Sequence, residues 1–182
     1  MKHYTYDDIL ALPEGVRAEL MDGQIYYMAS PTLTHQRILG NLYVDIVTYI
    51  RKNKGTCEAF PAPCAVFLYA DHSTYLEPDL IVVCDRDKLK PDGCYGAPDW
   101  VVEILSPSSR YLDCNKKLFK YQTAGVNEYW IVDPMNEMVR VYRFHTEDEE
   151  KTYEEYNFTD EIPNDVCKDL KLCISRFQSE TE

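Results

Sequence analysis

Long apolar runs are absent from the sequence. None of its apolar segments approaches the about 20 residues that a membrane-spanning helix requires. The amino-terminal residues MKHYTYDDIL are too polar for a signal peptide. We therefore expect a cytoplasmic protein with no membrane partner. Internal repeats, low-complexity linkers and evident domain boundaries are also absent, so the 182 residues are expected to form one domain that includes an acidic carboxy-terminal segment, 147–182.

Closely spaced cysteine pairs are absent as well. The seven cysteines are scattered along the chain, and no two of them form a C-x-x-C motif. A structural zinc site is therefore not expected, because such sites use closely spaced ligand pairs. Without a secretory signal, the cysteines are expected to be reduced and mostly buried thiols.

Positive charge is scarce. The chain has 19 Lys and Arg residues against 31 Asp and Glu residues, a formal net charge of −12. Because a negative surface repels phosphates, this balance argues against a general nucleic-acid-binding surface. The excess is uneven: residues 147–182 hold twelve acidic and four basic residues. Several of the remaining acids can belong to one site, so acidity makes DNA binding less favourable without excluding it.

The apolar residues that are present follow the periodicities of helices and strands. Thr5 and Asp8 have the spacing of a helix N-terminus, which predicts a short helix to about Leu12. Asp22-Gly23 lies between two short apolar segments and predicts a β-hairpin. Apolar residues at helical spacing then predict a long amphipathic helix: Ile38, Leu42, Ile46, Tyr49 and Ile50.

Four apolar segments bounded by turn-forming residues follow and predict the strands of a core. They are CAVFLYA (64–70), PDLIVVC (78–84), DWVVEIL (99–105) and EYWIVDP (128–134), with a helix over 113–124 that ends at Gly125. MVRVYRF (138–144) and TYEEYNF (152–158) predict a terminal hairpin. The resulting order, helix–strand–strand–strand–helix–strand, implies an α/β fold with a mixed sheet that is covered on both faces.

Two acidic residues lie within or beside the core strands. Asp79 follows Pro78 at the start of one strand, and Glu103 interrupts the apolar run of the next. A buried ionised carboxylate is costly unless a cation or hydrogen-bond donors compensate for it. Because neighbouring strands are about 4.8 Å apart, the two carboxylates and a backbone carbonyl such as that of Ile104 can share Mg²⁺. Alternatively, Asp79 caps a strand and Glu103 forms a buried ion pair with a lysine.

The helix after Glu103 provides such a lysine. Asp113, Lys117 and Tyr121 are four residues apart and therefore lie on one helical stripe. If this stripe faces the carboxylates, the ammonium group keeps them ionised and can orient a water molecule or a phosphate. Lys116 and Lys120 are neighbouring alternatives. If the stripe faces solvent, Asp113 and Lys117 form an ordinary surface pair worth about 0.3–0.5 kcal/mol.

Two further residues are candidates for the same site. Glu19, in the first strand of the predicted hairpin, is a possible third acid, and the alternative is a solvent-facing position. His35, at the start of the long helix, is a possible catalytic residue, and the alternative is a capping role.

Taken in order, these segments resemble the Uma-two-type restriction endonuclease family of the PD-(D/E)XK nuclease superfamily. The resemblance covers about residues 5–145. It rests on the segments AELMDGQIYYM, SPTLTHQRILGNL, EPDLIVV, DWVVEILSPSSR, KLFKY and AGVNEYWIVDP. It implies a restriction-endonuclease-like core, preceded here by a helix and a hairpin and followed by a hairpin.

The resemblance also implies a reaction, namely hydrolysis of DNA phosphodiester bonds with Mg²⁺, for which Mn²⁺ can substitute. Asp79 and Glu103 match the metal-binding acids of the family, with the Ile104 carbonyl as a further ligand. The superfamily signature has a lysine two residues after the second acid, where this chain has Leu105. The family supplies its lysine from the following helix, which matches Lys117.

Glu19 and His35 match site-lining positions of the family, and related nucleases often pair, which implies a homodimer. Two other functions remain open at this point. The chain can be a nuclease fold that does not cleave and acts as a DNA-binding or regulatory module. It can also be a protein-interaction domain whose acidic segment binds a basic partner.

Overall fold

The computed structural model describes residues 2–144 and 153–177. The first part of the chain contains α1 (Tyr6–Leu10), β1 (Ala18–Met21), β2 (Gln24–Tyr27), α2 (Leu33–Lys52), β3 (Glu58–Pro61), β4 (Val66–Phe67), β5 (Thr74–Leu76), β6 (Leu80–Val83), η1 (Arg86–Lys88), β7 (Leu89–Lys90) and β8 (Gly93–Tyr95). The second part contains β9 (Trp100–Ile104), η2 (Leu112–Lys117), α3 (Leu118–Ala124), β10 (Glu128–Asp133), β11 (Met138–Arg143), β12 (Glu154–Asn157), β13 (Ile162–Pro163), β14 (Lys171–Leu172) and η3 (Ile174–Phe177).

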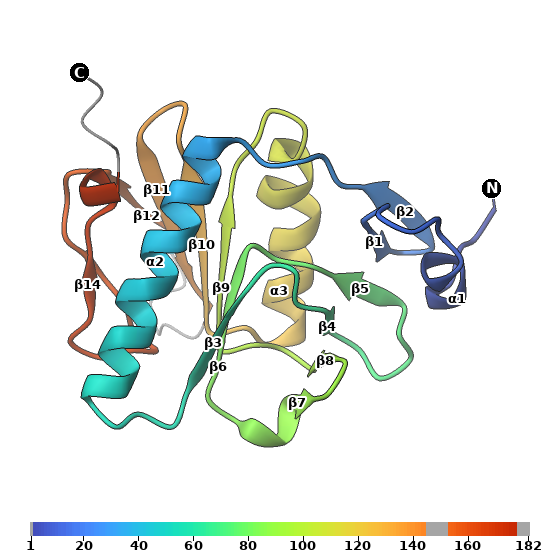
Figure 1. The fold of residues 1–182 in the computed structure, drawn as a ribbon, viewed down its shortest axis with the longest axis horizontal. Helices are drawn as coiled ribbons and strands as arrows, with labels where there is room; N and C mark the ends of the chain where they lie inside the picture. Colours follow the sequence, from blue (N-terminus) through green and yellow to red (C-terminus); the bar gives the residue numbers. More distant parts are fainter. Residues whose placement is uncertain (1, 145–152, 178–182) are drawn as a thin grey trace.

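A six-stranded sheet forms the centre of the fold, with the strand order β12-β11-β10-β9-β6-β3. Strands β9 and β10 are parallel, whereas the other neighbours are antiparallel. Helix α2 packs on one face and α3 on the other (Figure 1). The predicted mixed sheet with both faces covered is therefore confirmed, as is the order helix–strand–strand–strand–helix–strand.

Helix α2 begins where the sequence predicts it. The Thr32 side chain accepts a hydrogen bond from the His35 backbone N–H at 3.2 Å and thereby caps the helix. The apolar stripe packs onto the central sheet near Trp100 and Val102. Its buried members are Ile38, Leu39, Leu42, Ile46 and Ile50. This packing fixes the first turn of α2, which carries His35, at one end of the sheet.

The connection between the parallel strands β9 and β10 is helical. Its first six residues, η2, have π-helical geometry, and α3 continues the helix to Gly125, whose φ of 90° ends it in the left-handed conformation. Single π-helical turns are frequent at functional sites. This crossover lays η2 over the sheet face that carries Glu103.

A second six-stranded sheet, with the order β2-β1-β5-β4-β8-β7, packs beside α3. Its β1–β2 hairpin turns at Asp22 and Gly23, which have positive φ angles of 50° and 70°, as the Asp-Gly pair predicts. The strand predicted over 64–70 was placed in the wrong sheet. Only Val66–Phe67 is a strand, and it belongs to this second sheet.

In the central sheet, the position beside β6 that was predicted for residues 64–70 is occupied by β3, which pairs with β6 in the register Phe60↔Ile81. Its sequence, EAFP, lacks β-branched residues, and its position at the sheet edge explains why proline is tolerated there. The segment DHSTYLE, interpreted as a polar connection, in fact contains β5.

The expectation of seven reduced cysteines was wrong for two of them. Cys57 and Cys84 form a disulfide, and the other five cysteines are free. The cause is the strand register: Glu58 pairs with Val83, so the residues just beyond this pair face each other at the ends of β3 and β6. The sequence separation of 27 residues gives no hint of this pairing.

The predicted terminal hairpin is present as antiparallel β11 and β12. The acidic segment 147–182 lies partly outside the described residues, at 147–152 and 178–182. The described part packs on the sheet through buried apolar side chains that include Phe158, Ile162 and Leu172. Among the helices of residues 2–144 and 153–177, none has the length and apolar character needed to cross a membrane.

Candidate functional site

A cavity of about 580 Å³ lies at one end of the central sheet. It is bounded by the start of α2, the end of β2, the loop after β9 and the turn after β10. All five candidate side chains line this cavity: Glu19, His35, Asp79, Glu103 and Lys117. Residues that are up to 98 positions apart in sequence therefore meet in one place.

The segment 77–79 carries Asp79 to this place by crossing from the second sheet to the central one. It joins β5 to β6, and Glu19 holds its start by accepting a hydrogen bond from the Glu77 backbone N–H at 2.9 Å. At its end, Asp79 Oδ2 accepts a hydrogen bond of 2.7 Å from the Ile104 backbone N–H. The pairing of Leu80 with Val102 places Asp79 beside Glu103 on the neighbouring strand.

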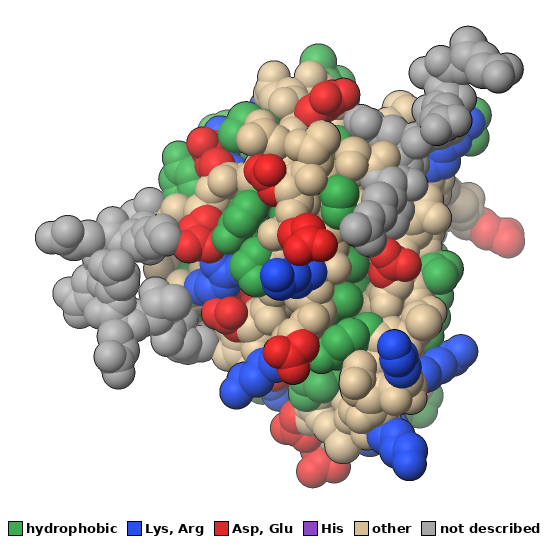
Figure 2. All heavy atoms as spheres, turned by 90° about the vertical axis from the view of Figure 1, so that its left-hand side faces the viewer, with side chains coloured by type: hydrophobic (Ala, Val, Ile, Leu, Met, Phe, Trp, Pro, Cys, Tyr) green, Lys and Arg blue, Asp and Glu red, His purple; other side chains and the backbone are tan. Residues whose placement is uncertain are grey.

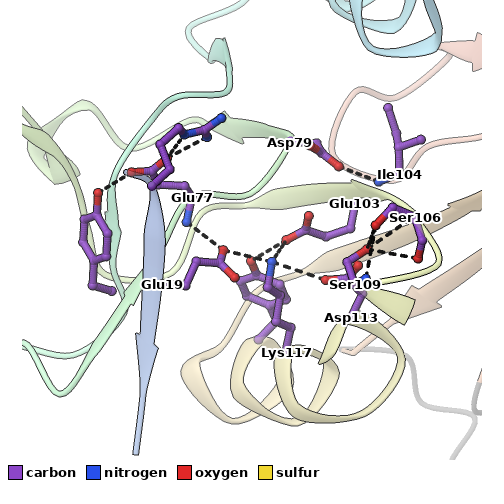
Figure 3. A network of polar contacts seen from close by, with 12 residues as sticks. Glu19, Glu77, Asp79, Glu103, Ile104, Ser106, Ser109, Asp113 and Lys117 are labelled. Carbon is purple, nitrogen blue, oxygen red and sulfur yellow. Dashed lines mark hydrogen bonds and ion pairs between the residues drawn. The ribbon is translucent and has the colours of Figure 1, made fainter. Parts of the chain in front are cut away.

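Three buried carboxylates surround the ammonium group of Lys117 (Figure 3). Lys117 Nζ lies 2.9 Å from Glu19 Oε1, 2.9 Å from Glu103 Oε1 and 3.3 Å from Asp113 Oδ1. These carboxylates come from three parts of the fold. Strand β1 belongs to the second sheet, β9 belongs to the central sheet, and η2 begins the helical connection between β9 and β10. Tyr121 donates a further hydrogen bond of 3.1 Å to Glu103 Oε1.

The surface alternatives for these residues are therefore wrong. Glu19 is 3% exposed instead of facing solvent, and Asp113 and Lys117 are 1% and 4% exposed instead of forming a surface pair. Leu105, at the position of the signature lysine, packs among buried apolar residues. The cation beside Glu103 is supplied by Lys117 from the following helix.

Three carboxylates share one ammonium group here, and this excess of negative charge shifts the pKa values of Glu103 and Lys117. Burial raises the pKa of Glu103 well above its usual range; Lys117 opposes this rise, whereas Asp113, Asp79 and Glu19 add to it. Burial by itself lowers the pKa of Lys117, but attraction by Glu103, Glu19 and Asp113 outweighs it and raises that pKa. The site therefore favours an additional positive charge, either a proton or a metal cation.

His35 contacts the other acid of the site. Its Nε2 lies 3.1 Å from Asp79 Oδ2, and its buried Nδ1 has no hydrogen-bond partner within the described chain. The side chain of His35 is 12% exposed. The capping residue of α2 is Thr32 and not His35, whose backbone N–H donates to Thr32 while its ring faces Asp79.

The donor set suits a hard divalent cation in chemistry and charge. It consists of carboxylate oxygens and the carbonyl of Ile104, which also borders the cavity. Asp113 Oδ1 is buried and has the Lys117 ammonium group, 3.3 Å away, as its ion-pair partner. In residues 2–144 and 153–177, however, no three His, Cys, Asp or Glu side chains converge on a common point suited to a metal. The carboxylates here turn towards Lys117 and the Ile104 N–H instead.

Sequence reasoning missed three polar side chains of the cavity wall, those of Arg17, Ser106 and Ser109. Arg17 pairs with Glu77 through an Nη2–Oε2 distance of 2.6 Å, and Tyr75 donates to the other oxygen of Glu77. Arg17 directly precedes β1, two residues before Glu19, and this spacing was a usable signal because residues two apart in extended chain share a face. Ser106 and Ser109, linked by hydroxyl hydrogen bonds, line the loop after β9.

Comparison with known proteins agrees with this architecture. A search of curated proteins finds no match. Among solved structures, the chain is similar to a putative nuclease belonging to DUF820 from Anabaena variabilis ATCC 29413. The TM-score is 0.75 and the sequence identity is 25%, over 95% of this chain and 96% of that one. Residues 5–172 match the Uma2 family, described as putative restriction endonuclease. The chain therefore belongs to the Uma2 family, as the sequence motifs predicted.

Proposed function

We propose that this protein is a metal-dependent endonuclease that hydrolyses phosphodiester bonds of DNA. The observation that carries the proposal is the excess of buried carboxylates around Lys117 at a cavity wall that Asp79 also lines. Buried charges are normally balanced by partners. An unbalanced acidic cluster that lines a cavity is therefore more consistent with a site for a cation and an anionic substrate than with a purely structural ion pair.

Asp79, Glu103 and the carbonyl of Ile104 are the residues that would hold Mg²⁺ or Mn²⁺, with Glu19 joining directly or through water. When bound, such an ion activates a water molecule and offsets charge on the scissile phosphate.

The remaining groups position these ligands. The Lys117 ammonium favours the ionised form of Glu103, forms an ion pair with Glu19 and can orient a water molecule or a phosphate oxygen. The Tyr121 hydroxyl restricts Glu103 Oε1 through its hydrogen bond. His35 orients Asp79 through its Nε2 contact, and its buried Nδ1 has no hydrogen-bond partner within the described residues.

A cleavage assay tests the proposal. Supercoiled and single-stranded DNA are incubated with wild type in Mg²⁺, Mn²⁺ or EDTA, alongside Asp79→Ala and Glu103→Ala. We expect metal-dependent cleavage that falls by at least about 100-fold in both variants, because each loses a metal ligand. Glu161→Ala, which removes a carboxylate from an exposed ion pair, is the matched control and should cleave normally. Cleavage that is unchanged in both site variants would come from a contaminant and would contradict the proposal.

One observation favours a second function, a nuclease fold that binds DNA or regulates without cleaving it. Asp79 Oδ2 is occupied by the Ile104 N–H and His35, and Glu103 Oε1 by Lys117 and Tyr121. This internally satisfied arrangement is what a site without a metal would adopt. Absence of both cleavage and Mn²⁺ binding, with DNA binding retained, would support it.

The pairing of two copies is part of the same proposal, because a dimer can present two sites to the two strands of a duplex. Sedimentation equilibrium should then give twice the 21.2 kDa of one chain. A mass of one chain at micromolar concentration would contradict it.

A further inference from the structure

The mouth of the cavity carries large apolar side chains that are exposed. Tyr27, the last residue of β2, is 69% exposed, and Met135, in the turn after β10, is 72% exposed; both line the cavity. Leu33 and Tyr111, next in sequence to other lining residues, are 74% and 67% exposed. Single exposed apolar residues are ordinary. Two such residues on the lining of one cavity, Tyr27 and Met135, are typical of a surface that binds a ligand.

The two lysine or arginine side chains that line this cavity are paired with carboxylates. Of the described lining residues, only Arg17 and Lys117 are lysine or arginine, and both contact carboxylates. Arg110, in the loop beside the cavity, binds both carboxylate oxygens of Asp133 at 2.9 and 2.8 Å. Figure 2 shows the face on the left-hand side of Figure 1, where Lys and Arg side chains in the central part lie close to Asp and Glu side chains.

This pairing disfavours duplex DNA as the preferred ligand. Binding of a duplex depends strongly on lysine and arginine contacts with its phosphates. A chain with a net charge of −12 and paired cations at its site supplies few of them. Stacking of bases on aromatic side chains can supply part of the affinity that phosphate contacts do not.

The depth of the acids points in the same direction. Glu103 is 3% exposed and Lys117 is 4% exposed, so these charged groups of the cavity wall are buried. In a duplex the bases lie within the stack and are reached only if they are flipped out. A single strand has unstacked bases, which stack readily on aromatic side chains. The volume of about 580 Å³ lies within the usual range for cavities that enclose a small ligand.

We infer that the cavity accepts a segment of single-stranded nucleic acid, with Tyr27 stacking on a base and Met135 packing against its neighbour at the mouth. The inference rests on the proposed function, because it places the adjoining phosphodiester near Glu103. It makes Tyr27 and Met135 determinants of substrate form, distinct from the groups that handle the metal.

Binding and cleavage are measured separately to test it. Fluorescence anisotropy gives the Kd of the full chain for a labelled single-stranded DNA, for the duplex of the same sequence and for the matching single-stranded RNA, with Ca²⁺ in place of Mg²⁺. The variants are Tyr27→Ala, Tyr27→Phe and Met135→Ala. Phe119→Ala is the matched control, since Phe119 is an aromatic residue that is 62% exposed and lies outside the cavity lining. Circular dichroism verifies folding, which is expected because each changed side chain is exposed.

We expect the single strand to bind at least about tenfold more tightly than the duplex. Tyr27→Ala should weaken single-strand binding about 5- to 150-fold, the loss that corresponds to one base–aromatic stack. Tyr27→Phe keeps the ring and should bind like wild type, as should Phe119→Ala. Tighter binding of single-stranded RNA than of single-stranded DNA would support the inference and would indicate RNA as the substrate.

Three results would overturn the inference: equal or tighter binding of the duplex, equal effects of Tyr27→Ala and Phe119→Ala, or no binding of any strand. These differ from failure of the proposed function. If wild type binds single strands through Tyr27 but cleaves nothing in Mg²⁺ or Mn²⁺, the nuclease proposal fails and the binding site stands. If wild type instead cleaves duplex DNA preferentially, the nuclease proposal stands and the inference of a single-stranded substrate fails.

Discussion

Lys117 is the residue whose removal tests the site most directly. Its ammonium group is the only cation of the described chain that contacts Glu19, Glu103 and Asp113, and its side chain is 5% exposed. Lys117→Met keeps the length and apolar stem of the side chain and removes the charge. The three carboxylates then remain buried without their partner.

The expected loss of stability is large. Removal of one partner of a buried ion pair costs about 3–5 kcal/mol, because the remaining charge stays desolvated. For a chain of 182 residues this corresponds to a fall in Tm of roughly 6–20 °C. It is also a large share of the about 5–15 kcal/mol that stabilises a typical domain.

The loss should depend on pH. The pKa of Glu103 is already raised by burial, and Lys117 holds the rise back, so the variant should have a still higher pKa at this carboxyl. A raised pKa means that the folded state holds the proton more tightly than the unfolded state does. The associated stability is present below the ordinary carboxyl pKa and is lost as pH rises through the folded-state pKa. The deficit of Lys117→Met should therefore be larger at about pH 8 than at about pH 5.

Urea unfolding in EDTA measures this effect. Trp100 and Trp130, the two tryptophans, are 0% exposed, so their fluorescence reports loss of the core. Lys171→Met is the matched control, because Lys171 forms a 3.5 Å pair in which both side chains are 60% exposed. Such surface pairs contribute about 0–1 kcal/mol. A second scan with Mn²⁺ should restore part of the stability of Lys117→Met, since an ion that binds only the folded state stabilises it.

A loss below about 1 kcal/mol at both pH values would refute the reasoning, because a buried acidic cluster cannot lose its cation at so small a cost. A larger loss at pH 5 than at pH 8 would also contradict it, since the sign follows from the raised pKa of Glu103.

Three further predictions concern the surroundings of the site and the stability of the fold. Tyr121→Phe removes the hydroxyl donor to Glu103 and should cost about 1–2 kcal/mol in urea unfolding; no change would show that the bond is not formed. Arg143→Met removes the cation 3.8 Å from the fully buried Glu128 and should increase amide exchange across residues 154–174; unchanged exchange there would count against an anchoring role. Thiol titration of the unfolded protein should find five free thiols without reductant and seven after reduction; seven in both would exclude the disulfide.

Local sequence patterns predicted most of the fold because each depends on neighbouring residues. The apolar stripe of α2, the Asp22-Gly23 turn and the Gly125 helix end all appear where the sequence indicates them. Prediction failed for strands whose place depends on distant partners. The apolar segment 64–70 was a better strand candidate than Glu58–Pro61, yet the edge of the central sheet takes the latter. The Cys57–Cys84 pairing followed from that register and was equally inaccessible.

The acids of the site were predictable for a different reason. An ionisable residue within an apolar strand is conspicuous, so Glu103 was identified from the sequence, and helical spacing connected Asp113 with Lys117. Burial was not predictable in the same way. Glu19 and Asp113 have equally plausible surface positions in a linear sequence, and only the packing of three elements buries them around one ammonium group.

Sequence patterns predicted most of the helices and strands, the Uma2 family and Asp79, Glu103 and Lys117 as site candidates. Only the folded structure shows that Glu19 and Asp113 contact the Lys117 ammonium group, and that Tyr27 and Met135 line the same cavity. The physical reason is that periodicity and turn chemistry act within a few residues. Charge balance and the shape of a cavity depend on which distant segments the folded chain brings into contact.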